Sequence, residues 1–133
     1  MSNETPPDLR YTKNHEWAKG APGEVVVGIT AFAVEQLGDV TLVNVDVHVG
    51  DAVTAGKPFG SIESVKTLSD LYAPIDGKVV RINAELANKP ELVNEDCYGK
   101  AWMIAIAPTD PAAVGALLDA AAYSEHVRTS SHA

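Results

Sequence analysis

Short β-branched segments separated by glycine and proline are the feature that most constrains what this 133-residue chain can fold into. The segment from 40 to 49 alternates, with Val43, Val45, Val47 and Val49 on one face and mostly polar side chains on the other, which is the period of a half-buried strand. Further strands are predicted over 24–29, 59–64, 67–72, 78–82 and 101–107. Many short strands with a turn signal about every ten residues predict a mainly β fold, a small sandwich or barrel.

Two helices are predicted beside these strands. Thr30 can cap a short helix that Gly38 ends, and a C-terminal helix is predicted to begin at Thr109 or Asp110, because Pro111 suits a first turn. The segments left over are a helical turn over 83–88 and an irregular loop over 89–100.

Length and composition indicate one domain with its own core. Residues 1–9 are predicted to be a flexible N-terminal tail, 10–123 the folded domain and 124–133 a polar C-terminal tail. A net charge of -8 argues against nucleic-acid binding and against an anionic membrane surface, and it favours docking onto basic patches of partner proteins. Cys97 is the only cysteine, so an intramolecular disulfide is impossible. Residues 1–10 resemble neither a signal peptide nor a transit peptide, so a cytoplasmic location is expected.

One lysine occupies a special position in this pattern. Lys66 lies between two predicted strands, at the tip of a β-hairpin bracketed by glycines and Pro74. A protein that carries a covalently tethered group needs a projecting lysine on a rigid support, with its amine free for an attaching enzyme. The sequence therefore predicts a carrier of a swinging arm, with no active site of its own. The alternative for most lysines is a solvated surface residue.

Several separated motifs, in the right order, resemble the glycine cleavage system H protein family. They are Tyr11-Thr12-Lys13-Asn14-His15-Glu16-Trp17, Val27-Gly28-Ile29-Thr30, Gln36-Leu37-Gly38-Asp39, Glu63-Ser64-Val65-Lys66 and Leu92-Val93-Asn94-Glu95. The resemblance runs from about Tyr11 to Tyr123. It implies a flattened antiparallel β-barrel of two sheets, a barrel-sandwich hybrid, with a short internal helix and a C-terminal helix.

The resemblance also implies a function and a cofactor. Lipoic acid would be joined in amide linkage to Lys66. The arm would carry the aminomethyl group of glycine from a pyridoxal-phosphate-dependent glycine decarboxylase to a tetrahydrofolate-dependent aminomethyltransferase, and electrons to dihydrolipoyl dehydrogenase. Lipoate-attaching enzymes would be further partners, and the free protein is expected to be a monomer.

The family pattern assigns roles to four more residues. Glu63, three residues before Lys66, is expected to be recognised by the lipoate-attaching enzyme. The cargo bears a primary amine that is cationic near neutral pH and is readily lost in water, so a carrier benefits from an acidic, partly desolvated cleft. Glu16 and Asp70, with Asn14 as a neutral partner, are the candidates to line it. For each carboxylate the alternative is an ordinary solvated side chain.

The other residues with chemical potential receive structural interpretations. His15 has no second His or Cys at ligand spacing, so a hydrogen-bonded structural histidine is expected rather than a base or metal ligand. Cys97 replaces the proline of the family's Asp-Pro-Tyr-Gly and is expected to loosen its loop, and no role is assigned to Gln36. The expected core anchors are Trp17 and Trp102, and the expected exposed histidines are His48, His126 and His132.

Three other functions remain open. A lipoyl or biotinyl domain of a 2-oxo acid dehydrogenase or carboxylase would show other neighbours around the lysine than Val65 and Thr67. A small acid–base enzyme using Glu16, Asp70 or His15 would need a catalytic constellation, and none is seen in the sequence. A lipoate depot that donates lipoyl groups to other complexes is compatible with every motif above.

Overall fold

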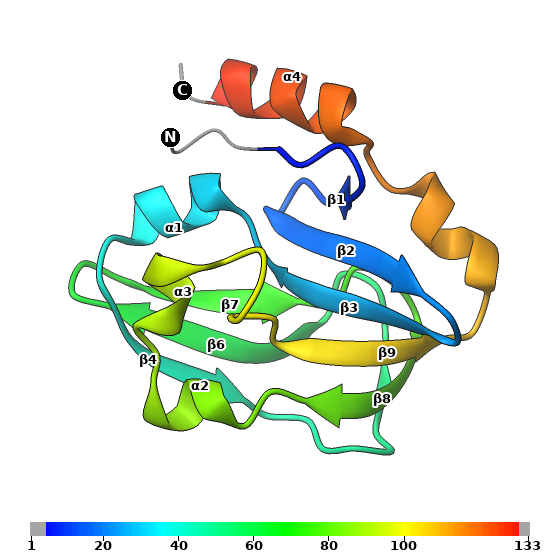
Figure 1. Cartoon of the computed structure of the whole chain (residues 1–133), viewed down its shortest axis with the longest axis horizontal. Coiled ribbons are helices and arrows are strands. Elements are labelled where there is room, and N and C mark those ends of the chain that lie inside the picture. The colour runs from blue at the N-terminus through cyan, green and yellow to red at the C-terminus, as the bar shows by residue number, and fades with distance from the viewer. Residues whose placement is uncertain (1–4, 131–133) are drawn as a thin grey trace.

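Two antiparallel sheets form the body of the molecule in the computed structural model, which describes residues 5–130 (Figure 1). In these residues the six-stranded sheet has the order β1-β2-β3-β9-β8-β5 and the three-stranded sheet the order β4-β6-β7. The strands are β1 (Arg10–Tyr11), β2 (Glu16–Ala21), β3 (Glu24–Ile29), β4 (Val40–Val45), β5 (Ala52–Val53), β6 (Pro58–Ser64), β7 (Leu68–Tyr72), β8 (Gly77–Ile82) and β9 (Ile104–Pro108). The expected mainly β fold with two antiparallel sheets is confirmed, although the sheets stay separate and do not close into a barrel.

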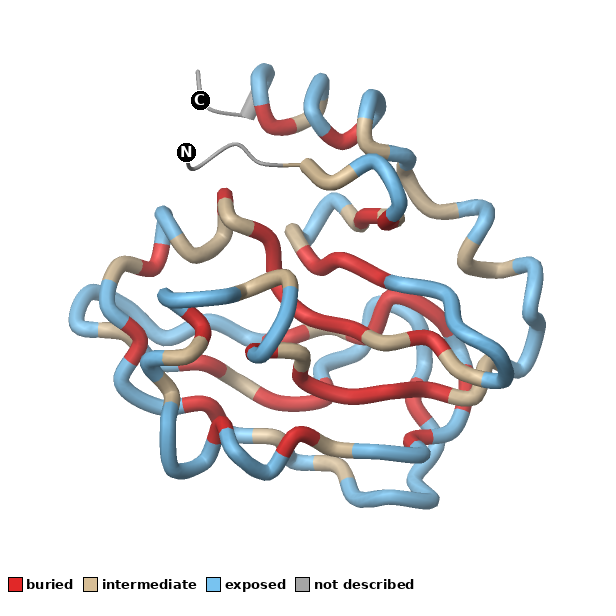
Figure 2. The backbone as a smooth tube through the Cα atoms, viewed as in Figure 1, coloured by how far each residue is buried: buried red, intermediate tan, exposed pale blue. Residues whose placement is uncertain are grey.

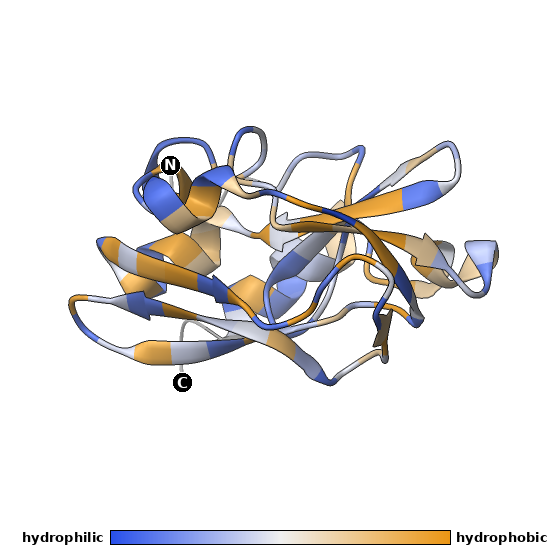
Figure 3. Ribbon diagram, turned by 90° about the horizontal axis from the view of Figure 1, so that it is seen from below, coloured by the Kyte–Doolittle hydropathy of each residue, from blue (hydrophilic) through white to orange (hydrophobic). Residues whose placement is uncertain are grey.

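The main hydrophobic core lies between the two sheets (Figure 2). Val27, Ile104 and Ile106 from the larger sheet pack in one cluster with Phe59 and Ile62 of the smaller sheet, and all five are at most 1 % exposed. Each strand contributes alternate side chains, because successive residues of a strand point to opposite faces. The alternation of hydrophobic and hydrophilic residues along the strands is visible from below in Figure 3.

Helix α1 (Ala31–Leu37) follows β3 as expected. The Thr30 hydroxyl accepts a hydrogen bond from the Ala33 backbone N–H, and Gly38 ends the helix with a φ of 78°, a value that favours glycine. The predicted turn over 83–88 contains α2 (Glu85–Asn88). The segment expected to be an irregular loop is partly helical, since α3 (Leu92–Glu95) lies within it and buries Val93.

The C-terminal helix begins later than the sequence predicts. Asp110 and Pro111 start only a 3-10 helix, η1 (Pro111–Ala116), and α4 extends over Ala120–Ser130. The interruption has a clear cause: the backbone of Leu118 exchanges two hydrogen bonds with Tyr11, of 2.8 and 2.9 Å, so this residue is extended and not helical. The Asp119 carboxylate then accepts a hydrogen bond from the Ala122 N–H and caps α4.

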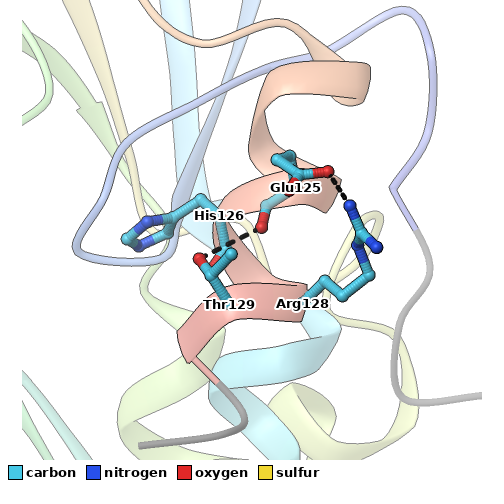
Figure 4. A network of polar contacts seen from close by, with 4 residues as sticks. All are labelled: Glu125, His126, Arg128 and Thr129. Atoms are coloured by element: carbon cyan, nitrogen blue, oxygen red, sulfur yellow. Dashed lines mark hydrogen bonds and ion pairs between the residues drawn. The ribbon is translucent and has the colours of Figure 1, made fainter.

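The described parts of both predicted tails, 5–9 and 124–130, take part in the fold. Residues 125–130 belong to α4, where the Thr129 hydroxyl bonds the backbone carbonyls of Glu125 and His126 and Arg128 pairs with Glu125 (Figure 4). Leu9 is buried in a second cluster that includes Trp17, Phe32 and Tyr123. Residues 1–4 and 131–133 of the predicted tails, with His132, lie outside the described residues, and the domain limits remain a prediction.

The strand predicted over 40–49 ends at Val45. Val43 is buried, Val45 and Val47 are half-buried and Val49 is 63 % exposed, so the apolar alternation loses contact with the core as it approaches the turn at Gly50. Over the described part of the chain, no helix is long and apolar enough to cross a membrane.

Candidate functional site

Lys66 lies at the tip of the hairpin formed by β6 and β7, as predicted, and its side chain is exposed. The Ser64 N–H donates to the Thr67 carbonyl over 2.8 Å, which closes the turn. The Ser64 hydroxyl oxygen accepts from the backbone N–H groups of Lys66 and Thr67, both at 3.2 Å. These bonds restrict the turn, so the lysine projects from an ordered backbone.

The hairpin tip also rests against the linker between α1 and β4. The Val65 N–H donates to the Asp39 carbonyl over 3.0 Å. The Lys66 Cε lies only 3.1 Å from where a Cβ on Gly38 would be, so the lysine stem packs on the bare backbone of that glycine. The Asn94 side chain holds the linker by bonding the Gly38 carbonyl at 2.8 Å and the Val40 N–H at 2.9 Å. The root of the lysine is therefore supported from two directions.

A cleft of about 370 Å³ opens beside this root, between α1, β7 and the turn before β2. It brings together Asn14, Glu16 and Asp70, the three side chains that the sequence singled out for it. Its other lining residues are His15, Ile29, Phe32, Ala33, Gln36, Leu37, Ile62, Thr67, Leu68, Ser69 and Leu71. The walls are thus apolar along α1 and mixed along the hairpin.

Glu16 is the buried carboxyl of the cleft, with 2 % of the residue exposed. One carboxylate oxygen accepts a 2.7 Å hydrogen bond from the Thr12 hydroxyl, and the other accepts a 3.3 Å bond from the Tyr72 N–H. Burial raises the pKa of Glu16 to about 7, although these hydrogen bonds act in the opposite direction. Near neutral pH the group therefore responds strongly to any charge that enters the cleft.

Asp70 and Asn14 belong to the rim. Both residues are exposed. Asp70 is paired with Ser61 across the hairpin, on the opposite face of the sheet from the buried Ile62. The sequence treated Glu16 and Asp70 alike, whereas the structure separates a desolvated carboxyl from a solvated one. Only the former has the environment in which a single ion pair is strong.

Glu63 is absent from the cleft lining and lies on the outer face of the three-stranded sheet, exposed to solvent. Its position relative to the cleft thus differs from that of Glu16 and Asp70, and its role in recognition by the attaching enzyme stays a prediction. The sequence assigned no role to Gln36 and Thr67, and both line the cleft. The position of Gln36 four residues after the buried Phe32 was the available signal, but a polar side chain at a helix end is usually solvated.

The histidines divide into two groups. His15 agrees with its interpretation as a structural residue: its Nδ1 lies 2.8 Å from the Tyr123 hydroxyl, and burial, followed by the nearby His126, lowers its pKa. The expectation for His126 is wrong, because it is half-buried and its Nε2 lies 3.2 Å from the Lys13 carbonyl. His48 is exposed as predicted.

The two tryptophans also differ. Trp17 is buried as expected, and its indole N–H donates to the Cys97 carbonyl over 2.9 Å. Trp102 is only half-buried, with the Arg81 guanidinium 4.8 Å from its ring centroid.

Comparison with known proteins places this geometry in one family. The family model described as "Glycine cleavage H-protein" matches residues 9–130. A glycine cleavage system H protein of Anaeromyxobacter sp. (strain K) is 52% identical over 124 residues, which cover 93% of this chain and 96% of that protein. The corresponding protein of Bacillus licheniformis is 48% identical over 124 residues, covering 93% and 97%.

A solved structure supports the same relation at the level of the fold. The crystal structure of a glycine cleavage system H protein from Mycobacterium marinum matches with a TM-score of 0.81 and 41% sequence identity, over 95% of this chain and 98% of that one. Sequence and fold agree along nearly the whole chain, and the chain belongs to the glycine cleavage H-protein family.

Proposed function

We propose that this chain is the non-catalytic lipoyl carrier of a glycine cleavage system, with lipoic acid in amide linkage to Lys66. The observation that carries the proposal is the ordered hairpin tip that projects Lys66 directly beside a cleft with one buried carboxyl, Glu16. The family relation supports it, because the relatives are named as components of that system.

The residues present fit a lipoyl group. The Lys66 amine is exposed, as an attachment site requires, and its stem lies over Gly38, next to the cleft-lining residues Gln36 and Leu37. The apolar side chains of α1 that line the cleft suit a hydrocarbon chain, and the buried carboxyl of Glu16 suits the amine of the cargo. When bound, the lipoyl group supplies the sulfur chemistry that receives the aminomethyl group of glycine and later gives up electrons.

The chain itself has three tasks in this scheme. The hairpin tip holds the root of an arm on the order of 10–15 Å long, from ordinary bond lengths, so that its end reaches the active sites of docked enzymes. Phe32 and Leu37 exclude water from one side of the resting arm. Glu16 accepts a charge-assisted hydrogen bond from the cargo amine, and the incoming cation lowers the carboxyl pKa so that it is ionised while the cargo rests.

The partners proposed are the glycine decarboxylase, the aminomethyltransferase, dihydrolipoyl dehydrogenase and a lipoate-attaching enzyme. An acidic carrier with a net charge of -8 suits transient docking onto basic surfaces, since long-range attraction raises association rates. The proposed location is the cytoplasm.

Intact mass with peptide mapping, before and after incubation with lipoate, ATP and a lipoate ligase, tests the proposal. A lipoyl increment confined to Lys66 is expected, and Lys66→Arg, which cannot form the amide, is expected to remain unmodified and to support no glycine decarboxylation. A biotin increment in a parallel reaction with a biotin ligase would instead assign the chain to the carboxylase class. No increment on the wild-type protein, with a working control acceptor present, would overturn the lipoyl carrier proposal.

A further inference from the structure

Three residues form a continuous row across the outer face of the small sheet. Leu42 on β4 is opposite Glu63 on β6, which is opposite Leu68 on β7. Residues directly opposite one another in antiparallel strands place their side chains on the same face. The adjacent pair, Val43 and Ile62, is buried in the core, so Leu42, Glu63 and Leu68, here called the outer row, face away from it. Leu68, at the end of the row, also lines the cleft.

The outer row is unusually apolar for a solvent-facing surface. Leu42 is 43% exposed and Leu68 63%, and Val65 at the adjoining hairpin tip is 70% exposed. Of the large hydrophobic residues that are exposed within 5–130, only Val49 and Val80 lie outside this hairpin region. Glu63 lies between the two leucines and takes part in no ion pair among the described residues. Exposed apolar patches mark protein interaction sites, and the charge of Glu63 adds a specific requirement for a cationic partner group.

The length of the lysine side chain indicates which partner enzyme must cover this surface. A bare lysine side chain extends only about 6 Å from its Cα, from standard bond lengths. An enzyme that acylates the Lys66 amine must therefore enclose the hairpin tip. Because strands are about 4.8 Å apart, the outer row spans about 10 Å beside that tip and is covered in such a complex. Enzymes that act on the far end of the finished arm reach their target without covering it.

We propose that the outer row is the docking surface for the lipoate-attaching enzyme, which presents a cationic side chain flanked by apolar side chains to Glu63 between Leu42 and Leu68. This inference rests on the proposed function. The resemblance leads one to expect only Glu63 in this role, whereas the structure adds the two leucines on either side. In the complex, the Lys66 amine forms the amide as the acyl–phosphate bond of lipoyl adenylate breaks, and AMP and a proton leave.

The chain offers matched controls for a kinetic test. Leu42→Ser is compared with Val80→Ser, at residues 43% and 36% exposed, and Leu68→Ser with Val49→Ser, both 63% exposed. The first pair decides the test, because Leu68 also lines the cleft. With a lipoate ligase, lipoate and ATP, the rate of the mass increment gives kcat/KM for attachment. Truncating a central apolar contact is expected to lower kcat/KM about tenfold, mainly through KM, while the controls stay within about twofold. Leu42→Met, which keeps the apolar contact, is expected to stay near the wild type.

Two further measurements separate docking from other causes. A small activated ester is expected to acylate the Lys66 amine equally fast in every variant, which shows that the tip is intact. In the wild-type protein, methyl NMR signals of Leu42 and Leu68 are expected to broaden when ligase is added, whereas those of Val49 and Val80 do not.

The outcomes distinguish this inference from the function on which it rests. A wild-type protein that is not lipoylated overturns the proposed function. Lipoylation of the wild type with equal kcat/KM in Leu42→Ser and Val80→Ser, or with unperturbed Leu42 and Leu68 methyl signals, overturns the docking surface alone. A Leu42→Ser protein, lipoylated in advance, that is equally impaired with the glycine decarboxylase would also overturn it, because the row would then serve partners in general.

Discussion

At the scale of single residues, burial separates carboxylates that the sequence presents as equals. Glu16 and Asp70 both line the cleft, yet only Glu16 is removed from water. A charge in a desolvated site interacts with an incoming cation far more strongly than one at an exposed rim. We therefore expect the affinity of the cleft for a cation to depend mainly on Glu16, with a weaker, screened contribution from Asp70.

Glu16 should leave a signature in the pH dependence of stability. Burial raises its pKa from 4.5 to about 7, so between these values the folded protein binds more protons than the unfolded chain. The free energy of unfolding must then fall as the pH rises through this window, by at most about 3 kcal/mol at 1.36 kcal/mol per pKa unit. In urea unfolding from pH 4.5 to 7.5, the unfolding free energy of the wild type minus that of Glu16→Gln should decrease as the pH rises. Parallel curves for the two proteins would contradict the raised pKa.

Glu16 and Asp70 should differ in how strongly each slows the loss of the aminomethyl group from the loaded protein. Removing the charge at Glu16 costs a buried charge-assisted hydrogen bond, about 1.5–3 kcal/mol, so Glu16→Gln should release the aminomethyl group roughly tenfold to a hundredfold faster. Asp70→Asn removes a solvated charge worth about 0.2–1 kcal/mol, so a change of less than about fivefold is expected. Rates of formaldehyde and ammonia release from the loaded protein give both numbers, with Glu85→Gln on α2 as an exposed control. The assignment fails if Asp70→Asn has the larger effect.

At the scale of elements, the hairpin and the α1–β4 linker form one unit. The Val65–Asp39 hydrogen bond and the contact between Lys66 and Gly38 join segments that are far apart in the sequence, and Asn94 holds the linker from behind. The root of the Lys66 side chain is thus supported by three segments of the chain.

Gly38→Ala tests this unit, with Gly23→Ala as the control. Both glycines have a φ near 75–78°, but only Gly38 has a neighbour that an added methyl group would touch. Each substitution should lower the unfolding free energy through backbone strain, by about 1–3 kcal/mol at Gly38, whose ψ of -148° lies in a region that is nearly exclusive to glycine. Only Gly38→Ala should also shift the NMR signals of the Lys66 Cε and of the Val65 amide. Unchanged Lys66 signals in that variant would remove the glycine contact from the description.

At the scale of the whole molecule, α4 is tied to the site through one hydroxyl group. The Tyr123 hydroxyl lies 2.7 Å from the Thr30 hydroxyl, which caps α1, and 2.8 Å from Nδ1 of His15, which adjoins Glu16. The Tyr123 ring stacks on Tyr11 with centroids 4.6 Å apart. The C-terminal helix therefore helps to fix both walls of the cleft from outside.

Tyr123→Phe should destabilise the fold more than Tyr11→Phe. The first change leaves two largely buried polar groups without that partner, at about 1–3 kcal/mol, whereas the second frees only the half-exposed Pro6 carbonyl, at about 1 kcal/mol. Urea denaturation of the two variants measures the difference, and an equal loss would show that the hydroxyl does not link the three elements.

Features of the fold that depend on neighbouring residues can be predicted from the sequence, whereas those that depend on distant residues cannot. Local signals sufficed for the Lys66 hairpin and for α1 with its Thr30 cap and Gly38 end, whereas the alternating strand predicted over 40–49 ends at Val45. They misplaced the C-terminal helix because the pairing of Leu118 with Tyr11 joins residues more than a hundred positions apart. The distinction between Glu16 and Asp70 and the outward direction of Leu42 were hidden for the same reason, since burial and strand register exist only in the assembled sheets.

The hydrogen bond from the Tyr72 N–H to Glu16 has a consequence of its own. It connects β7, an edge strand of the small sheet, to the first residue of β2 in the large sheet, through the same carboxylate that is proposed to receive the cargo. A cation that attracts the carboxylate changes the strength of the hydrogen bond that the carboxylate accepts from the Tyr72 N–H. We therefore expect the chemical shift of the Tyr72 amide to report whether the proposed arm is at rest or away, without any label on the arm.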